Sequence, residues 1–203
     1  MNFNEKIILE NDRVRLEPLT IHHFDELLPI SIESPNLLEF SPSLFGSSEM
    51  LKENLEIAVQ ARNSNLRYPF AIFDKQQNRF VGSTSFGNIS TKDSRLEIGW
   101  TWIDEKTQGT GLNKQCKLLL LSYAFGKLSA QRIEFKTDSR NIQSKKAIEK
   151  IGGTYEGTFR SHTLMRDGYR RDTAYYSILS NEWPEIKSEI FKENGTQQGV
   201  KMN

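Results

Sequence analysis

The stretch from residue 94 to residue 137 constrains the fold of this chain more than any other part of the sequence. It begins with an apolar strand pattern over residues 94–103 and passes through a loop that contains two glycines. A helix pattern follows over residues 112–127, with two neighbouring apolar stripes that predict burial over a wide arc. A second strand pattern covers residues 131–137. Strand, helix and strand in this order fit a right-handed crossover, which joins two parallel strands.

Further strand and helix patterns surround this unit. Strands are also predicted over residues 13–19, 68–73, 79–86, 154–165 and 169–179. Helices are predicted to begin near residue 22 and at residue 47 or 48, to follow residues 138–141, and to close the chain near 183–190. This order predicts an α/β fold, a mixed sheet of about seven strands that is parallel at its centre and flanked by helices. We expect one domain over residues 1–192 and a disordered polar tail over residues 193–203.

Composition excludes several classes of function. The 203 residues carry 27 basic and 26 acidic side chains, a balance that argues against a nucleic-acid-binding protein. No stretch approaches the ~18 apolar residues of a membrane span, and the start has no signal-peptide core. One cysteine and three histidines, without a His-Glu-x-x-His helix, predict no metal site. We therefore expect a globular cytoplasmic protein with neither nucleic acid nor membrane as partner, and the sequence leaves its oligomeric state open.

The loop before the long helix, Gln108-Gly-Thr-Gly-Leu-Asn113, is a candidate anion site. The first N–H groups of a helix have no intrahelical partner and attract anions, and glycines let a phosphate approach the backbone. The spacing fits neither a Walker A loop nor a dinucleotide fingerprint, because Lys114 stands where each would require another residue. Taken alone, the loop is equally well interpreted as a tight turn between strand and helix.

Neighbouring motifs decide between these interpretations. Gln108-x-x-Gly111-x-Asn113 resembles the Gln/Arg-x-x-Gly-x-Gly/Ala signature of the GNAT superfamily of N-acetyltransferases, from which Asn113 departs. Leu96-Glu-Ile-Gly-Trp100, Asn141-x-x-Ser144 and Ile151-Gly-Gly153 resemble the branch related to the ribosomal-protein N-terminal acetyltransferases, the RimJ/RimL-like group. The resemblance covers roughly residues 11–187 and implies a GNAT-like fold and acetyl-CoA as cosubstrate, without a metal.

The resemblance also implies roles for individual residues. The pyrophosphate of coenzyme A would lie on backbone N–H groups of the loop, which comprises Gln108, Gly109, Thr110, Gly111, Leu112 and Asn113. The pantetheine arm would lie where the strands ending near Ile103 and Thr137 splay apart. Trp102 and Ile103 would offer it backbone hydrogen bonds. Asn141 would lie near the pantetheine and Ser144 near the thiol.

Glu97 is the first candidate for the catalytic base. It lies in an otherwise apolar strand, where alternation places it on the face of Thr101 and opposite Trp100. A partly buried carboxylate there could accept a proton from the attacking amine, directly or through water. The alternatives are a solvated face or a salt bridge with Arg95 or Arg132.

Three other residues complete the set of candidates. Ser144 shares the apolar face of its predicted helix with Ile148, so it either faces the cofactor as a catalytic residue or allows close packing. His162 is the next candidate base, because histidine titrates near neutral pH, although it also fits an ordinary exposed strand position. Cys116 lies in an apolar stripe and is predicted to be core rather than a nucleophile.

Together these features predict an acetyl-CoA-dependent N-acetyltransferase that transfers acetyl to a primary amine by direct attack in a ternary complex. The acceptor is either a small-molecule amine or a peptide or protein N-terminus. The alternative is a non-catalytic regulatory domain that binds CoA or acetyl-CoA. Segments 34–46 and 160–172 are expected to form the acceptor mouth. The arginines of the second segment, Arg160, Arg166, Arg170 and Arg171, would either hold an acidic substrate or a peptide carbonyl or protect a solvated edge.

Overall fold

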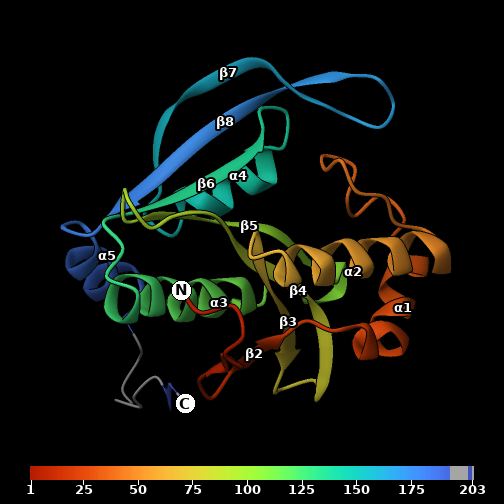
Figure 1. The fold of residues 1–203 in the computed structure, drawn as a ribbon, viewed down its shortest axis with the longest axis horizontal. Helices are drawn as coiled ribbons and strands as arrows, with labels where there is room; N and C mark the ends of the chain where they lie inside the picture. The colour runs from red at the N-terminus through yellow and green to blue at the C-terminus, as the bar shows by residue number, and fades with distance from the viewer. Residues whose placement is uncertain (193–200, 203) are drawn as a thin grey trace.

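The computed structural model describes residues 1–192 and 201–202, and its described strands form one mixed sheet in the order β7-β8-β6-β5-β4-β3-β2-β1-β9 (Figure 1). The strands are β1 (Leu9–Glu10), β2 (Val14–Pro18), β3 (Arg67–Asp74), β4 (Arg79–Ser90), β5 (Arg95–Ile103), β6 (Arg132–Asp138), β7 (Thr154–Leu164), β8 (Arg170–Leu179) and β9 (Lys201–Met202). The α-helices are α1 (Phe24–Glu33), α2 (Ser48–Asn63), α3 (Leu112–Ser122), α4 (Ile142–Glu149) and α5 (Trp183–Ile190).

The predicted α/β class and the predicted strands are confirmed. The structure adds two strands of two residues each, β1 and β9, which pair with one another beside β2. The predicted tail lies mostly outside the described residues, because only residues 201–202 of it are described, as β9. The long helix predicted over residues 112–127 is α3 followed by one π-helical turn, Tyr123–Lys127.

One pair of neighbouring strands, at the centre of the sheet, is parallel, and the pairs on either side of it are antiparallel. Strands β2 to β5 pair antiparallel in sequence order, and β6 pairs antiparallel with β8. Between these two halves, β5 and β6 run parallel, with α3 in the connection, as the crossover pattern predicted. Parallel pairing is limited to Arg95–Glu97 of β5 with Arg132–Glu134 of β6. Beyond these residues the described strands no longer pair, so the sheet opens toward the carboxyl ends of β5 and β6.

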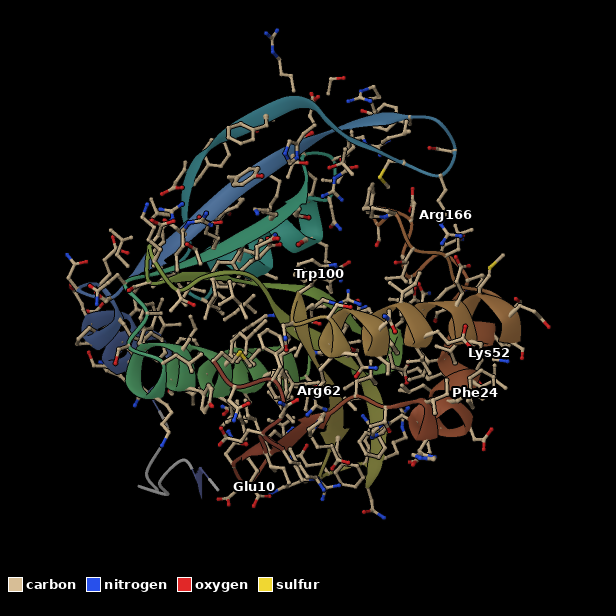
Figure 2. The ribbon with its side chains drawn as sticks, viewed as in Figure 1. Glu10, Phe24, Lys52, Arg62, Trp100 and Arg166 are labelled. Carbon is tan, nitrogen blue, oxygen red and sulfur yellow. The ribbon has the colours of Figure 1, made fainter. Side chains whose placement is uncertain are left out.

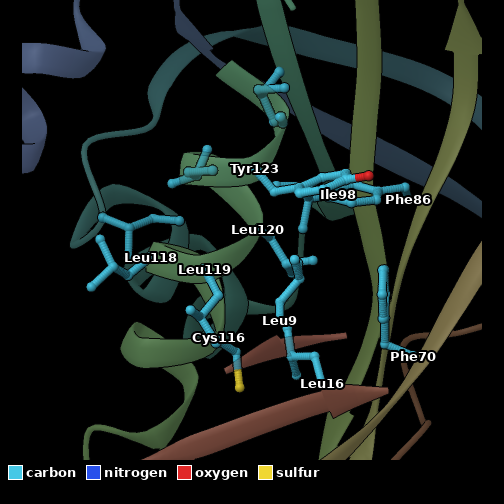
Figure 3. Close-up of a cluster of buried hydrophobic side chains, with 14 of the residues drawn as sticks. Leu9, Leu16, Phe70, Phe86, Ile98, Cys116, Leu118, Leu119, Leu120 and Tyr123 are labelled. Atoms are coloured by element: carbon cyan, nitrogen blue, oxygen red, sulfur yellow. The ribbon is translucent and has the colours of Figure 1, made fainter. Parts of the chain in front are cut away.

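Two apolar clusters cover the two faces of the sheet. Helices α1 and α2 pack on one face through Leu27, Leu51 and Leu55. Helices α3, α4 and α5 contribute to the larger cluster on the other face, where Leu119 and Leu120 of α3 face strand side chains (Figure 3). Burial of an aliphatic side chain stabilises the fold by roughly 1.5–3 kcal/mol, so these helices are held firmly against the two faces of the sheet. No helix within the described ranges is both long and apolar enough for a membrane crossing.

Candidate active site

The glycine loop lies at the open end of the sheet and has the backbone of an anion site. Gly109 and Gly111 have φ values of +77° and +85°, which favour glycine. A Cβ added at either position would meet no atom within 4 Å, so the loop faces open space. Gly111 is the N-cap of α3 and provides no capping side chain, so the first N–H groups of the helix remain available for an anion.

Gln108 fixes this loop to the two elements on either side of it. Its Nε2 donates to the carbonyl oxygen of Ile103 at the end of β5 (3.0 Å). Its Oε1 accepts from Nε2 of Gln143 in the first turn of α4 (2.6 Å). Thr110 donates its hydroxyl to the carbonyl oxygen of Thr107 (2.7 Å) and thereby tightens the turn. The loop, the end of β5 and the start of α4 are therefore one connected unit.

The predicted cofactor residues next to this loop differ in what they offer. Leu112 is buried in the core, and Asn113 has a buried side-chain oxygen without a hydrogen-bond partner among the described residues. Trp102 pairs with Ser83 of β4, and its ring packs edge-on against Phe45 (centroids 4.8 Å apart). Open glycines and an unsatisfied buried amide fit a polar ligand that lies along the loop.

The predicted Asn-x-x-Ser pair forms the start of α4. Oδ1 of Asn141 accepts the backbone N–H of Ser144 (2.9 Å), so Asn141 is the N-cap of this helix. Ser144 is half-buried. Because Gln143 of the same turn bonds to Gln108, the structure brings this pair beside the glycine loop.

Glu97 is buried and has two polar partners. Its Oε2 accepts from Nδ2 of Asn88 (2.6 Å) and lies 2.7 Å from Nζ of Lys136. The ion pair is therefore with Lys136 of β6, whereas Arg95 and Arg132, the partners considered from the sequence, pair with Glu134. Burial lowers the pKa of Lys136, but the hydrogen bond and charge of Glu97, together with Tyr175 and Glu134, outweigh burial and leave that pKa raised.

His162 does not touch Glu97. Its Nδ1 lies 3.1 Å from Oγ1 of Thr173, and its Nε2 lies 3.4 Å from the hydroxyl of Tyr175. Nζ of Lys136 lies over the Tyr175 ring, 5.0 Å from the centroid. A row of side chains thus crosses β5, β6, β8 and β7 on one face, with Glu97 and His162 about three strand spacings, ~14 Å, apart. The two candidate bases cannot share one proton directly.

A bulge in β5 corrects the predicted alternation. Trp100 has φ of +50°, and the register between β4 and β5 shifts at this point. The added residue turns Thr101 toward α3, where its Oγ1 accepts from Nζ of Lys117 (2.8 Å). The Trp100 ring lies against Gly87, the cross-strand partner of Glu97, and thus on the Glu97 face. The faces predicted for Trp100 and Thr101 were both wrong.

Two titratable residues of α3 are buried, Lys117 beneath this bulge and Cys116 in the core. Burial lowers the pKa of Lys117 to about 8, and its ammonium has hydroxyls rather than a carboxylate as partners. Burial raises the pKa of the Cys116 thiol to about 12, so the thiol is protonated at neutral pH. Cys116 is core, as predicted.

The two segments predicted to form the acceptor mouth contact one another (Figure 2). Nε of Arg166 donates to the carbonyl oxygen of Pro42 (2.8 Å), and its Nη2 pairs with Glu53 of α2 (2.7 Å). Nη1 of Arg171 donates to the carbonyl oxygen of Phe40 (3.0 Å). The β7–β8 hairpin therefore closes over the end of α2 on the Glu97 face.

A cavity outside this face contains none of the predicted site residues. This shallow cavity of about 450 Å³ is lined by residues that include Glu17, His22, His23 and Arg62. Within residues 1–192 and 201–202, no three His, Cys, Asp or Glu side chains are grouped as metal ligands would be.

Comparison with known proteins identifies the family. The model of the acetyltransferase (GNAT) domain matches residues 13–154. The chain belongs to the GNAT acetyltransferase family. A crystal structure of a GCN5-related N-acetyltransferase from Brucella melitensis resembles this GNAT protein with a TM-score of 0.84 and 29% identity, covering 91% of this chain and 83% of the other.

Two curated relatives are also similar in sequence to this chain. YdaF of Bacillus subtilis (strain 168) is 32% identical over 102 residues, and the match spans 50% of this GNAT protein and little more than half, 55%, of YdaF. The ribosomal-protein-serine acetyltransferase of Escherichia coli (strain K12) is 22% identical over 175 residues, which cover 85% of this chain and 96% of that protein. Membership of GNAT is confirmed, and relatives of this kind support the RimJ/RimL-like branch.

Sequence reasoning missed two residues of this face, Lys136 and Tyr175, and the buried Lys117 on the other face. Lys136 and Tyr175 stand in ordinary strand patterns, and only the register of β6 and β8 brings them between Glu97 and His162. Lys117 is the one charged residue within the apolar stripes of α3, a signal that the pattern contained.

Proposed function

We propose that this protein is an acetyl-CoA-dependent N-acetyltransferase that transfers acetyl to a primary amine. One observation carries the proposal: parallel pairing of β5 and β6 stops after Glu97 and Glu134, and the Gly109–Gly111 loop stands at the open end. An extended chain with an anionic end fits this arrangement, because unpaired strand edges can bind its amides and the start of α3 can bind its phosphates.

Different residues of this chain would bind the cofactor and protonate the leaving thiolate. Backbone N–H groups of residues 109–113 hold the pyrophosphate, and the amide of Asn113 is available to a polar group beside them. Bound acetyl-CoA supplies the acetyl thioester. Ser144, at the start of α4, gives a proton to the departing sulfur. The family match and the position of Ser144 beside the loop support this role.

The amine must lose its charge before it can attack. A lysine side chain has a pKa of ~10.4 and an α-amino group a pKa of ~8, so a base is needed near neutral pH. Glu97 takes up this proton, directly or through water, while Asn88 and Lys136 hold its carboxylate in place. His162 is the next candidate, and Tyr175 with Lys136 connects it to Glu97. Direct attack in a ternary complex uses this whole face and needs no covalent cysteine.

The relatives indicate the kind of acceptor. The E. coli relative is named as a ribosomal-protein-serine acetyltransferase. A peptide or protein N-terminus and a small-molecule amine both remain acceptors to be tried, and the mouth between segments 34–46 and 160–172 would admit either.

Thermal unfolding with and without acetyl-CoA tests the cofactor. At a concentration of ~100 times Kd, a ligand that binds only the folded state stabilises it by ~2.7 kcal/mol, or ~5–10 °C for a chain of this size. Gly111→Asp should abolish this shift, because a side chain and a negative charge would enter the phosphate site. Gly168→Asp is the matched control, since Gly168 also has a positive φ (+83°) and an open Cβ position but lies in the β7–β8 hairpin.

Turnover is then followed as free thiol released with a panel of amines. Thiol release that depends on an amine supports transfer. No thermal shift with the wild-type protein would refute the cofactor assignment. A shift without turnover on any amine would instead establish the alternative, a regulatory domain that binds CoA.

A further inference from the structure

Arg67, the first residue of β3, is a buried cation that has no anionic partner in the part of the chain that the structure describes. Only 9% of its surface is exposed. Its Nε is buried and has no hydrogen-bond partner. No hydrogen bond or ion pair of the described residues involves the rest of the guanidinium, which lies over the Trp100 ring. Burial lowers the pKa of Arg67. An arginine remains protonated in proteins, so the charge itself stays in this site.

A buried, unpaired guanidinium lowers the free energy of unfolding, so its presence needs a physical reason. Buried charges in proteins are normally paired, and a buried donor without a partner keeps its full desolvation cost. Two partly buried arginines of this protein follow the rule. Arg13 pairs with Asp74, and Arg132 pairs with Glu156. The missing counter-ion of Arg67 therefore points to an anion that arrives from outside the chain.

The position of Arg67 indicates which ligand could supply this anion. Arg67 is the cross-strand partner of Gly87, and Gly87 is the partner of Glu97 on its other side. The Trp100 ring lies against Gly87, and the Arg67 guanidinium lies 5.1 Å from its centroid. Arg67, the indole and the Glu97 carboxylate thus lie on one face of the sheet, and Figure 2 labels Trp100 on it.

The phosphates of the cofactor lie too far away to be this anion. Gly87, the partner of Arg67, is five residues along β4 from Gly82, which pairs with Ile103 at the end of β5. At ~3.3 Å per residue the separation is ~16 Å along the strand, and the glycine loop follows beyond Ile103. The acceptor, whose amine must reach the Glu97 face, is the molecule that passes over Trp100.

A second guanidinium borders the same face from the opposite side. Arg171 of β8 is half-buried, and its hydrogen bonds go to the carbonyl oxygen of Phe40 (3.0 Å) and to the hydroxyl of Thr173 (3.2 Å). Burial lowers its pKa against the opposing effects of Asp138 and Glu97. It has no carboxylate salt bridge in the described part of the chain, so positive charge lies on both sides of Glu97.

We propose that the acceptor of this enzyme carries a carboxylate as well as the amine, and that Arg67, backed by the Trp100 ring, binds that carboxylate. This inference rests on the proposed function and names the chemical class of its substrate. The carboxylate lies on the β3 side of Trp100 and the amine at Glu97. Arg171 adds a second positive charge to the field that the acceptor meets.

The test compares acceptors that differ only in this carboxylate. One pair is the peptide Ala-Glu-Ala-amide against Ala-Gln-Ala-amide, and the other is the dipeptide Ala-Ala against Ala-Ala-amide, so that a side-chain carboxylate and a C-terminal α-carboxylate are distinguished while the amine stays nearly the same. For one pair at least, kcat/KM for the carboxylate member should be about 10- to 100-fold higher, as expected for charge-assisted hydrogen bonds. Arg67→Gln should bring this ratio near one and leave the amide member within about two-fold.

Two further variants separate binding from folding. Arg67→Lys keeps the charge and should restore part of the ratio. Lys52→Gln removes an exposed cation of α2, at a distance from Trp100 (Figure 2), and should leave the ratio unchanged. Arg67→Gln should melt at the wild-type temperature or above it, because the burial cost of the unpaired charge that it removes exceeds the contact with the Trp100 ring that it loses.

The same pairs are titrated by calorimetry into the CoA-free protein, which measures acceptor binding without turnover. Binding of the carboxylate member that Arg67→Gln weakens at least about ten-fold supports the inference, even where no amine is acetylated and the proposed function fails. Equal kcat/KM and equal binding within both pairs would overturn it. A lower melting temperature of Arg67→Gln with an unchanged ratio would also overturn it and make Arg67 structural.

Discussion

Replacement of Lys117 by Met should stabilise the protein at neutral pH. The Lys117 side chain is 6% exposed beneath the β5 bulge, and its Nζ lies 2.8 Å from Oγ1 of Thr101 and 3.4 Å from that of Thr84. Met has a similar length and no charge. The two threonine hydroxyls lie 2.8 Å apart and can bond to each other after the exchange, so neither is left without a partner.

The magnitude follows from the pKa of the buried amine. Burial lowers the pKa of Lys117 from 10.5 to about 8. Between these values the unfolded chain binds a proton that the folded chain does not, so the free energy of unfolding rises with pH across this window. The full difference corresponds to about 3 kcal/mol, at 1.36 kcal/mol per pKa unit, and it opposes folding at pH 7. Roughly 2 kcal/mol of it should disappear between pH 7 and pH 9.5.

Urea denaturation of the wild type and of Lys117→Met from pH 6.5 to pH 9.5 measures this directly. The variant should be more stable at pH 7, and its advantage should shrink steadily toward pH 9.5. The change with pH is the decisive quantity, because loss of the hydrogen bonds alters the stability difference equally at every pH. Lys114→Met, an exposed lysine of the same helix, is the control and should change stability by less than ~0.5 kcal/mol. A variant that is less stable at pH 7, or a difference that does not vary with pH, would refute the reasoning.

Three further substitutions test the catalytic face. Glu97→Gln should slow transfer ~10²–10⁴-fold near pH 7 and recover as the pH approaches the pKa of the amine, and an unchanged pH–rate profile would remove Glu97 from the mechanism. Ser144→Ala should lower kcat, by up to ~10²-fold, more than it weakens acetyl-CoA binding; wild-type kinetics would leave Ser144 a packing residue. Gly87→Ala should displace the Trp100 ring at a cost of ~1–3 kcal/mol in stability and raise the acceptor KM, while an unaltered KM would show that the ring position is immaterial.

Much of this architecture could be predicted because it depends on local patterns. Alternation and helical periodicity located each of the longer strands, and the glycine loop marked the start of α3. The helix over 48–63 begins at the predicted capping serine, where the hydroxyl of Ser47 accepts the N–H of Met50. Two-residue strands such as β1 and β9 are too short for any period to reveal. The π-helical turn continues the apolar stripes of α3, so the pattern cannot distinguish it from an α-helix.

The site was harder to predict, because one inserted residue determines it. The segment over 95–103 alternates regularly in the sequence, yet the bulge at Trp100 exchanges the faces of Trp100 and Thr101. Thr101 consequently reaches the buried Lys117, and Trp100 lies on Gly87 beside Arg67. Periodicity assigns a face only while the ladder is regular, and the ladder depends on the neighbouring strand.

Arg67 illustrates the same limit for charge. In the sequence it is an ordinary arginine at the start of a strand. Its residue type does not reveal whether a carboxylate will lie beside it. Its meaning depends on two quantities that only the fold supplies, its burial and the absence of a counter-ion among the described residues. A protein keeps such a costly group where binding gains from it, since a guanidinium that is already desolvated interacts more strongly with an arriving carboxylate than one in water. The unpaired cation beside Trp100 is thus better evidence for the acceptor than the exposed hairpin arginines, of which Arg166 is already neutralised by Glu53.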